Sequence, residues 1–196
     1  MTDAKRRTPR IAASLVNGLR RSLIEDGTWE RVEHEVLRRA PMLSEWLAEA
    51  EQCEWVSLEG HLRLLQALLD VLGEEAIAAR GAARLREDLD VGPLAPILRA
   101  WMRGFAKDPA ELMRVAPHVY QAITRDAGRM VLVGSDARSI RFAVREPPRL
   151  LCELRGWHVL MEGFGTELLR TSGRQGSVSV RPAPDGESLL ISAVWD

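Results

Sequence analysis

The chain has 196 residues, of which 46% are hydrophobic and 28% are charged, and its formal net charge is -1. These values are typical of a soluble globular protein of one domain, and they argue against a strongly electrostatic partner such as duplex DNA. Every apolar run is interrupted before it reaches the roughly 18 residues that a membrane span requires. We therefore expect neither nucleic-acid binding nor a membrane span.

The two cysteines, Cys53 and Cys152, are far apart in the sequence and form no Cys-x-x-Cys pair, so no zinc site or disulfide framework is supported. Residues 1–10 are rich in lysine and arginine but lack the apolar core of a signal peptide. We expect this stretch to be a flexible basic tail, and the protein to be cytoplasmic with reduced thiols and no bound metal.

Helices are predicted throughout residues 11–127. Thr8 and Pro9 form a helix-start signal, which is followed at four-residue spacing by Ile11, Leu15, Leu19 and Leu23. Ser57 opens a helix whose wide leucine face runs from Leu58 to Leu72, which predicts a central position in the core.

Residues 74–88 are helical again, but their side chains are small, as at Ala76, Ala79, Gly81 and Ala83. Such a helix either lets a second helix approach closely or leaves space for a bound molecule, and close packing is the preferred interpretation. A helix containing Trp101 follows. Asp108 and Pro109 then begin another helix, which is expected to bend at Pro117.

The hydrophobic period changes at Gly128 from helical to alternating. Strands are predicted over residues 130–133, 139–144, 177–181 and 189–195. The turns within each pair have hairpin length, so the sheet should be mainly antiparallel. Residues 147–165, between the two pairs, are predicted as one amphipathic helix that ends at Gly163-Phe164-Gly165.

The fold class is therefore predicted as α+β, with N-terminal helices packed on a four-stranded, mainly antiparallel sheet. Residues 128–196 form a β-β-α-β-β unit in this interpretation, and the helical region of residues 11–127 belongs to the same structural domain.

Four short stretches resemble a known superfamily: DGTWERV at Asp26 to Val32, GRMVLV at Gly128 to Val133, LLCELRGW at Leu150 to Trp157, and the final Val194-Trp195. The first resembles the opening of haem–nitric-oxide-binding domains and their haem-free relatives. The others are closer to a myxobacterial family of uncharacterised proteins of about this length. That family is similar to 4-vinyl-reductase-type ligand-sensing domains and to the small subunits of TRAPP vesicle-tethering complexes.

The resemblance covers most of the chain and implies an α+β fold that is often dimeric. It also implies a space between helices and sheet that holds haem, an aromatic effector or an acyl chain, or is closed. Two family features are missing here. The cysteines of a C-x-x-x-G-D-P-x-C pattern are absent from RPAPDGESLLIS, and Tyr120 is followed by Gln121-Ala122-Ile123 instead of the Tyr-x-Ser-x-Arg motif that holds haem propionates.

Neither haem nor catalysis is expected from the polar residues. His118 lies in roughly the part of the chain where the resemblance would place a haem ligand. A surface or core position is nevertheless the preferred interpretation for it and for His34, His61 and His158. The sequence has no Ser-His-Asp arrangement with a glycine elbow and no glycine-rich phosphate loop. We therefore expect no cofactor and no enzymatic activity.

Two functions remain, and the sequence favours the first. It is a non-enzymatic adaptor or dimerisation module, like the similar TRAPP subunits, that acts on a second copy or on a signalling or small-GTPase partner; its candidate interface residues are Trp55 and Trp195. The alternative is a sensor that binds a small apolar ligand, an acyl chain or an aromatic molecule, between helices and sheet. Its candidate pocket residues are Leu65, Trp101, Tyr120 and Trp157.

Overall fold

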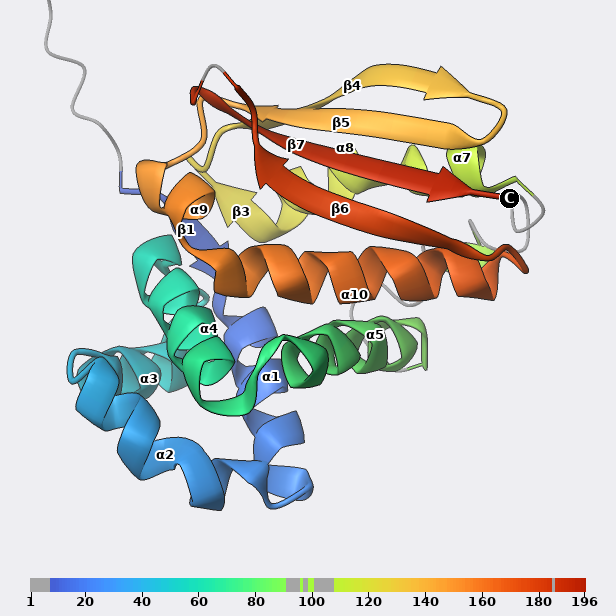
Figure 1. Cartoon of the computed structure of the whole chain (residues 1–196). Coiled ribbons are helices and arrows are strands. Elements are labelled where there is room, and N and C mark those ends of the chain that lie inside the picture. Colours follow the sequence, from blue (N-terminus) through green and yellow to red (C-terminus); the bar gives the residue numbers. More distant parts are fainter. Residues whose placement is uncertain (1–7, 91–95, 97–98, 101–107, 185) are drawn as a thin grey trace, which may run out of the picture.

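The computed structural model describes residues 8–90, 96, 99–100, 108–184 and 186–196 (Figure 1). The chain is an α+β protein, as predicted: N-terminal helices are followed by a four-stranded antiparallel sheet built by the C-terminal part. The predicted helix that contains Trp101 falls largely outside the described residues, and Trp101 itself is among those not described.

The N-terminal part is mainly helical. Its elements are β1 (Arg10–Ala12), α1 (Ala13–Glu25), α2 (Thr28–Arg39), α3 (Leu43–Gln52), β2 (Trp55–Ser57), α4 (Leu58–Leu72) and α5 (Glu74–Asp90). The leucine face of α4 is buried except at its end, Leu72, which is partly exposed; Leu62, Leu65 and Leu68 are exposed by 1% or less. Its predicted central position is confirmed, because α4 contacts α2, α3, α5, β1 and β2.

A small three-stranded sheet joins distant parts of the chain. β1 pairs antiparallel with β2 on one side and with β3 (Thr124–Arg125) on the other. The helix start predicted at Thr8 and Pro9 is therefore wrong, because residues Arg10–Ala12 are extended by this pairing and α1 begins only at Ala13. Strands of two or three residues have too few positions to show an alternation, so the sequence does not reveal them.

The C-terminal part confirms the predicted β-β-α-β-β unit. After α7 (Pro109–Met113) and α8 (Ala116–Ile123), the elements are β4 (Arg129–Asp136), β5 (Ser139–Arg145), α9 (Arg149–Glu153), α10 (Arg155–Thr171), β6 (Gly176–Pro182) and β7 (Ser188–Trp195). The strand order is β4-β5-β7-β6, and every neighbouring pair is antiparallel. Asp108 caps α7 by accepting the N–H of Ala110 at 2.9 Å, as its sequence context predicts.

The single helix predicted over residues 147–165 is wrong in its bounds. The chain is extended at Leu154, which separates α9 from α10, and α10 continues to Thr171. Gly163 and Gly165 do not end the helix. They lie inside it, at positions where a neighbouring element packs closely against the helix backbone. A Cβ on Gly163 would lie 1.9 Å from the Ala78 carbonyl oxygen, and one on Gly165 would lie 2.8 Å from a methyl group of Val178.

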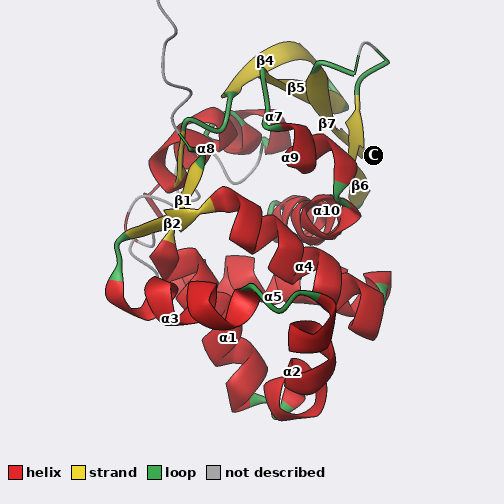
Figure 2. Ribbon diagram, turned by 90° about the vertical axis from the view of Figure 1, so that its left-hand side faces the viewer, coloured by secondary structure: helices red, strands yellow, loops and turns green. Residues whose placement is uncertain are grey.

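Helices cover one face of the four-stranded sheet. α10 packs along β6, while α7 contacts β5 and α8 contacts β4 (Figures 1 and 2). The covered face is formed by the buried strand residues Met130, Ile140, Phe142, Val144, Val178, Val180, Leu189, Ala193 and Trp195. The other side of α10 packs on α5 and α4, so this helix lies between the sheet and the N-terminal helices. None of the helices in the described residues is long and apolar enough to cross a membrane.

Candidate functional site

Three of the four predicted pocket residues lie in the core, and the fourth, Trp101, is outside the described residues. Leu65, Tyr120 and Trp157 are exposed by 0%, 4% and 6%. The start of α10 presses on α4 beside Leu65: a Cβ on Gly156 would lie 2.4 Å from the Leu65 carbonyl carbon. This contact brings Leu65 and Trp157 to the same region. Tyr120 is on α8, where its hydroxyl donates a hydrogen bond of 2.7 Å to the Ala127 carbonyl oxygen.

The small-residue helix packs directly on α10. A Cβ on Gly81 would lie 2.0 Å from the Leu160 carbonyl oxygen, and the contact of Gly163 with Ala78 is equally close. The backbones of α5 and α10 therefore touch, which confirms the packing interpretation of residues 74–88. Along this contact no volume separates the N-terminal helices from α10.

The two candidate interface tryptophans differ in exposure. Trp195 is only 5% exposed and belongs to the covered face of the sheet, so its indole offers almost no surface to a partner. Trp55 is half-buried on β2, and the guanidinium carbon of Arg125 lies 3.8 Å from its ring centroid. Of the two, Trp55 alone retains accessible surface.

A surface cleft opens where the two parts of the chain meet. Its larger cavity has a volume of about 1070 Å³ and lies between Pro9, the β3–β4 connection, α9 and the β6–β7 turn. A smaller cavity of about 210 Å³ adjoins it at the start of α4. Both cavities are lined by Thr8, Pro9, Pro148 and Arg149, so they form one cleft beside α9.

The two cavities differ in chemistry. The smaller is lined mainly by apolar residues: Pro9, Leu58, Leu62, Pro148 and Leu150. The larger has a polar rim that includes the ion pair between Arg149 and Glu153, whose closest atoms are 2.5 Å apart. The cleft thus combines an apolar recess with a charged mouth, which suits a small ligand with one polar end.

The backbone at the mouth of the cleft adopts an uncommon conformation. Asp126 and Glu146 have φ values of 53° and 52°, in the left-handed region that non-glycine residues rarely adopt. Both residues line the larger cavity, beyond the end of the β4–β5 ladder at Arg129 and Arg145. Such residues cluster at ligand-binding sites.

The sequence interpretation did not identify this cleft. Its lining comes from segments near residues 8, 58, 126, 148 and 187, and no motif links them. The only local signal is the Pro147-Pro148 pair, which indicates an extended entry to α9.

No protein-family model matches this sequence, and no curated protein sequence matches it. Solved structures do resemble the fold. The Fe(II) unliganded H-NOX protein of K. algicida is 12% identical with a TM-score of 0.63, over 95% of this chain and 97% of that one. An S. oneidensis H-NOX protein in the Fe(II)NO state is 13% identical, with a TM-score of 0.53 over 95% and 99% of the two chains. A T. tengcongensis H-NOX mutant is 11% identical, with a TM-score of 0.54 over 95% and 98%. The predicted resemblance to haem–nitric-oxide-binding domains is therefore confirmed for the fold.

The residues present do not fit haem. All four histidines lie in the described residues: His34 and His118 are exposed, while His61 is buried in α4. His158 is buried as well, and its Nε2 lies 2.7 Å from the Leu151 carbonyl oxygen, so this nitrogen carries a proton and is not free to bind iron. Burial lowers the pKa of both His61 and His158. Together with the closed contact between α5 and α10, these positions leave no histidine facing a haem-sized space within the described residues.

Proposed function

We propose that the chain is a regulatory sensor domain that works without haem and binds a small apolar ligand in the cleft beside α9. The fold it shares with H-NOX proteins supports a sensor more than an adaptor. The observation that carries the proposal is the position of the cleft. Thr8 and Pro9, directly before β1, form one wall together with the start of α4, while α9 and the β6–β7 turn form the other.

The apolar recess sets the class of ligand. At about 210 Å³ it accommodates a single aromatic ring or a short acyl chain. The apolar part of the ligand would occupy this recess between Leu62 and Leu150. Its polar end would point to the larger cavity, where Arg149 lies at the mouth. Charged ligands without an apolar part would gain nothing from the recess.

Binding at this position links the two parts of the molecule. A ligand that contacts both walls stabilises the arrangement in which they are closest, and so shifts the population of conformations. This gives a sensor an output that needs no chemical reaction.

The test uses the neutral single-ring dye 4-(dimethylamino)benzonitrile, whose fluorescence increases in apolar sites and whose size matches the recess. We expect saturable binding to the full chain. The variant Leu150→Trp fills the recess and should weaken binding by at least about tenfold, equivalent to roughly 1.4 kcal/mol. The matched control is Ile24→Trp, because Ile24 is 42% exposed on α1, away from the cleft.

Equal binding by wild type and Leu150→Trp would contradict the proposal, as would an absence of saturable binding. Native mass spectrometry of protein purified from its own host complements the dye. A small molecule that is retained natively and released on denaturation would identify the ligand class directly.

A further inference from the structure

The four-stranded sheet has one face that the helices do not cover, and its composition follows from the strand register. Side chains at alternate positions point away from α7, α8 and α10, and the pairing arranges them in rows across the sheet. One row holds Arg181, Leu190, Ala143 and Val131, from β6 to β4. The next row on one side holds Ser188, Arg145 and Arg129, and on the other side Ser179, Ser192, Arg141 and Gly134.

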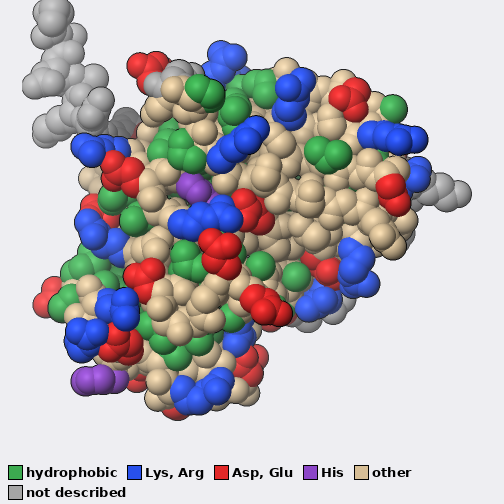
Figure 3. Space-filling view, in the orientation of Figure 1, with side chains coloured by type: hydrophobic (Ala, Val, Ile, Leu, Met, Phe, Trp, Pro, Cys, Tyr) green, Lys and Arg blue, Asp and Glu red, His purple; other side chains and the backbone are tan. Residues whose placement is uncertain are grey.

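This outward face is basic although the whole chain is not. Arg129, Arg141, Arg145 and Arg181 are all exposed on it, whereas the net charge of the chain is -1. Asp136, at the β4–β5 turn, is the one acidic residue in the four strands. Its carboxylate accepts hydrogen bonds from the Ser139 hydroxyl and the Arg138 N–H, at 2.6 and 2.9 Å. Figure 3 shows basic side chains over the upper part of the molecule, where the sheet lies, with a few acidic side chains among them.

Three of these arginines form no ion pair within the described residues. In the part of the chain that the structure describes, no carboxylate lies within ion-pair distance of Arg129, Arg145 or Arg181. Arg129 and Arg145 are direct cross-strand partners. Two like charges placed opposite each other destabilise a sheet. An anionic partner would remove this loss of stability by screening the repulsion between the two arginines.

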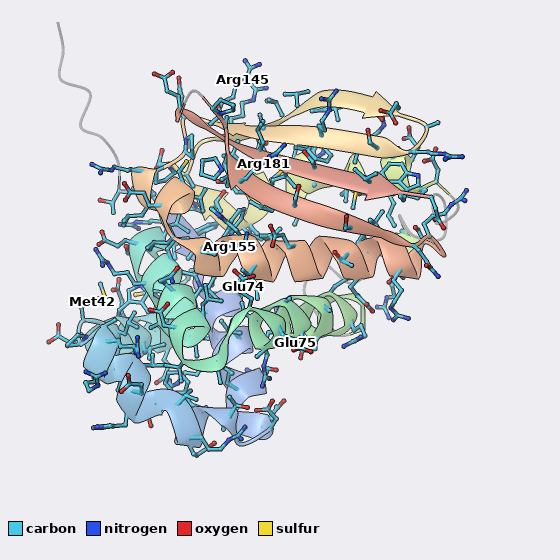
Figure 4. All side chains as sticks on the ribbon, in the orientation of Figure 1. Met42, Glu74, Glu75, Arg145, Arg155 and Arg181 are labelled. Atoms are coloured by element: carbon cyan, nitrogen blue, oxygen red, sulfur yellow. The ribbon has the colours of Figure 1, made fainter. Side chains whose placement is uncertain are left out.

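The arginines surround an apolar row. Leu190, Ala143 and Val131 lie between Arg129 and Arg145 on one side and Arg141 on the other, with Arg181 at one end. Ala143 is only 6% exposed, so half-buried Leu190 and Val131 provide the accessible apolar surface. Figure 4 shows Arg145 and Arg181 toward the same end of the sheet. An apolar centre with arginine around it is the usual composition of a protein–protein interface, in which arginine is enriched and lysine depleted.

We propose that this outward face of the sheet is the docking surface for an acidic protein partner, which reads the state of the domain. Arginine forks pair with carboxylates in two-point hydrogen bonds, and Leu190 with Val131 supplies the apolar contact. A second copy of the chain is disfavoured here, because a two-fold contact would bring the same arginines together. Single-stranded nucleic acid is disfavoured because the outward positions carry no aromatic side chain on which a base could stack.

The test measures the fluorescence anisotropy of a labelled peptide of alternating glutamate and leucine, added to the full chain. We expect binding that weakens with salt, and no binding of the matched glutamine–leucine peptide. The double variant Arg145→Glu/Arg181→Glu should weaken binding by at least about tenfold. The control Arg21→Glu/Arg38→Glu, which makes the same charge change at exposed positions of α1 and α2, should stay within about twofold of wild type.

Two further variants separate docking from general electrostatics. Leu190→Ala should weaken peptide binding severalfold without any change in charge. Arg129→Thr should also weaken it, yet raise the melting temperature, because the like-charge pair with Arg145 is removed. Circular dichroism verifies that each variant is folded, and Arg145→Gln/Arg181→Gln replaces the charge reversal if that variant unfolds.

The proposal is overturned if the acidic peptide does not bind, if the α1–α2 control loses as much affinity as the sheet variant, or if Leu190→Ala has no effect. Tighter binding of oligouridine or of phosphatidylserine vesicles would overturn it as well, and would assign the face to nucleic acid or to an anionic membrane. These outcomes are independent of the dye experiment on the cleft.

Discussion

The guanidinium carbon of Arg125 lies 3.8 Å from the ring centroid of Trp55, diagonally across the single strand β1. Trp55 belongs to β2 and Arg125 to β3, two strands separated by most of the helical part. A cation this close to an indole face is attracted by the ring quadrupole. The pair therefore links the two edge strands of the small sheet, which adjoins the cleft at Ser57, the last residue of β2.

Replacing Arg125 should loosen this sheet. We expect Arg125→Ala to lower the free energy of unfolding by about 0.5–2 kcal/mol and to change the tryptophan emission. Arg10→Ala is the matched control, because Arg10 lies in the same sheet and is exposed but makes no cation–π contact in the described residues. Equal destabilisation by the two variants in urea titrations would mean that the Trp55 contact contributes nothing.

The contact between α5 and α10 should tolerate no added carbon. In Gly163→Ala the new Cβ would lie 1.9 Å from the Ala78 carbonyl oxygen, so the helices must separate. We expect a loss of about 1–3 kcal/mol or more, measured by thermal unfolding. Thr166→Ala, at an exposed position of the same helix, should stay within about 0.5 kcal/mol of wild type. A Gly163→Ala protein as stable as the control would show that the two backbones are not in contact.

The buried His61 should make the protein sensitive to mild acid. Its side chain is 4% exposed, its Nδ1 has no hydrogen-bond partner in the described structure, and burial lowers its pKa from 6.5 to about 4. Below pH 6.5 the His61 imidazole therefore binds a proton in the unfolded chain, whereas in the folded chain it does so only below about pH 4. Stability should fall as the pH decreases through this window, by about 3 kcal/mol at its lower end.

The check is a comparison of unfolding free energies between pH 7 and pH 4, in wild type and His61→Leu. The variant should lose most of the slope, although buried His158, whose pKa is also lowered, contributes in the same direction. His34→Gln, at an exposed position of α2, should keep the wild-type slope. An unchanged slope in His61→Leu would contradict the assignment.

The outer edge of β6 is held by a carboxylate of α10. Glu162 Oε1 accepts the Val180 N–H at 2.8 Å, and both carboxylate oxygens bond to Arg155 at 2.8 Å. We expect Glu162→Ala to cost about 1–3 kcal/mol and to accelerate hydrogen exchange at the Val180 amide, because the arginine and this N–H both lose their partner.

Arg155 has a second carboxylate partner, Glu74, at 3.2 Å, which supplies the control (Figure 4). Glu74 is 64% exposed, so Glu74→Ala should cost less than about 0.5 kcal/mol and leave the Val180 amide protected. If both substitutions had the same effect on exchange, the edge of β6 would not depend on Glu162.

The sequence predicts elements well where the pattern is long enough to repeat. The alternation of Ile140, Phe142 and Val144 identifies β5, and the leucines of α4 identify its central position. Prediction from sequence fails where a residue that a tertiary contact requires has the same appearance as a local signal. Gly163 and Gly165 resemble a helix end, but they are glycines because Ala78 and Val178 pack against them. The cleft was not predictable, since its walls meet only after β1 has paired with β3.

The direct contact of α5 with α10 also has a consequence for how the chain folds while it is being synthesised. Residues near Gly81 find their packing partners, Leu160 and Phe164, only after the ribosome has added some eighty residues more. Until then, the face of α5 that α10 will cover remains exposed to water. β1 likewise lacks its pairing partner until β3 has been synthesised. The N-terminal part therefore cannot complete its fold during early translation, and such late-closing contacts make folding slow and increase the exposure of nascent chains to chaperones.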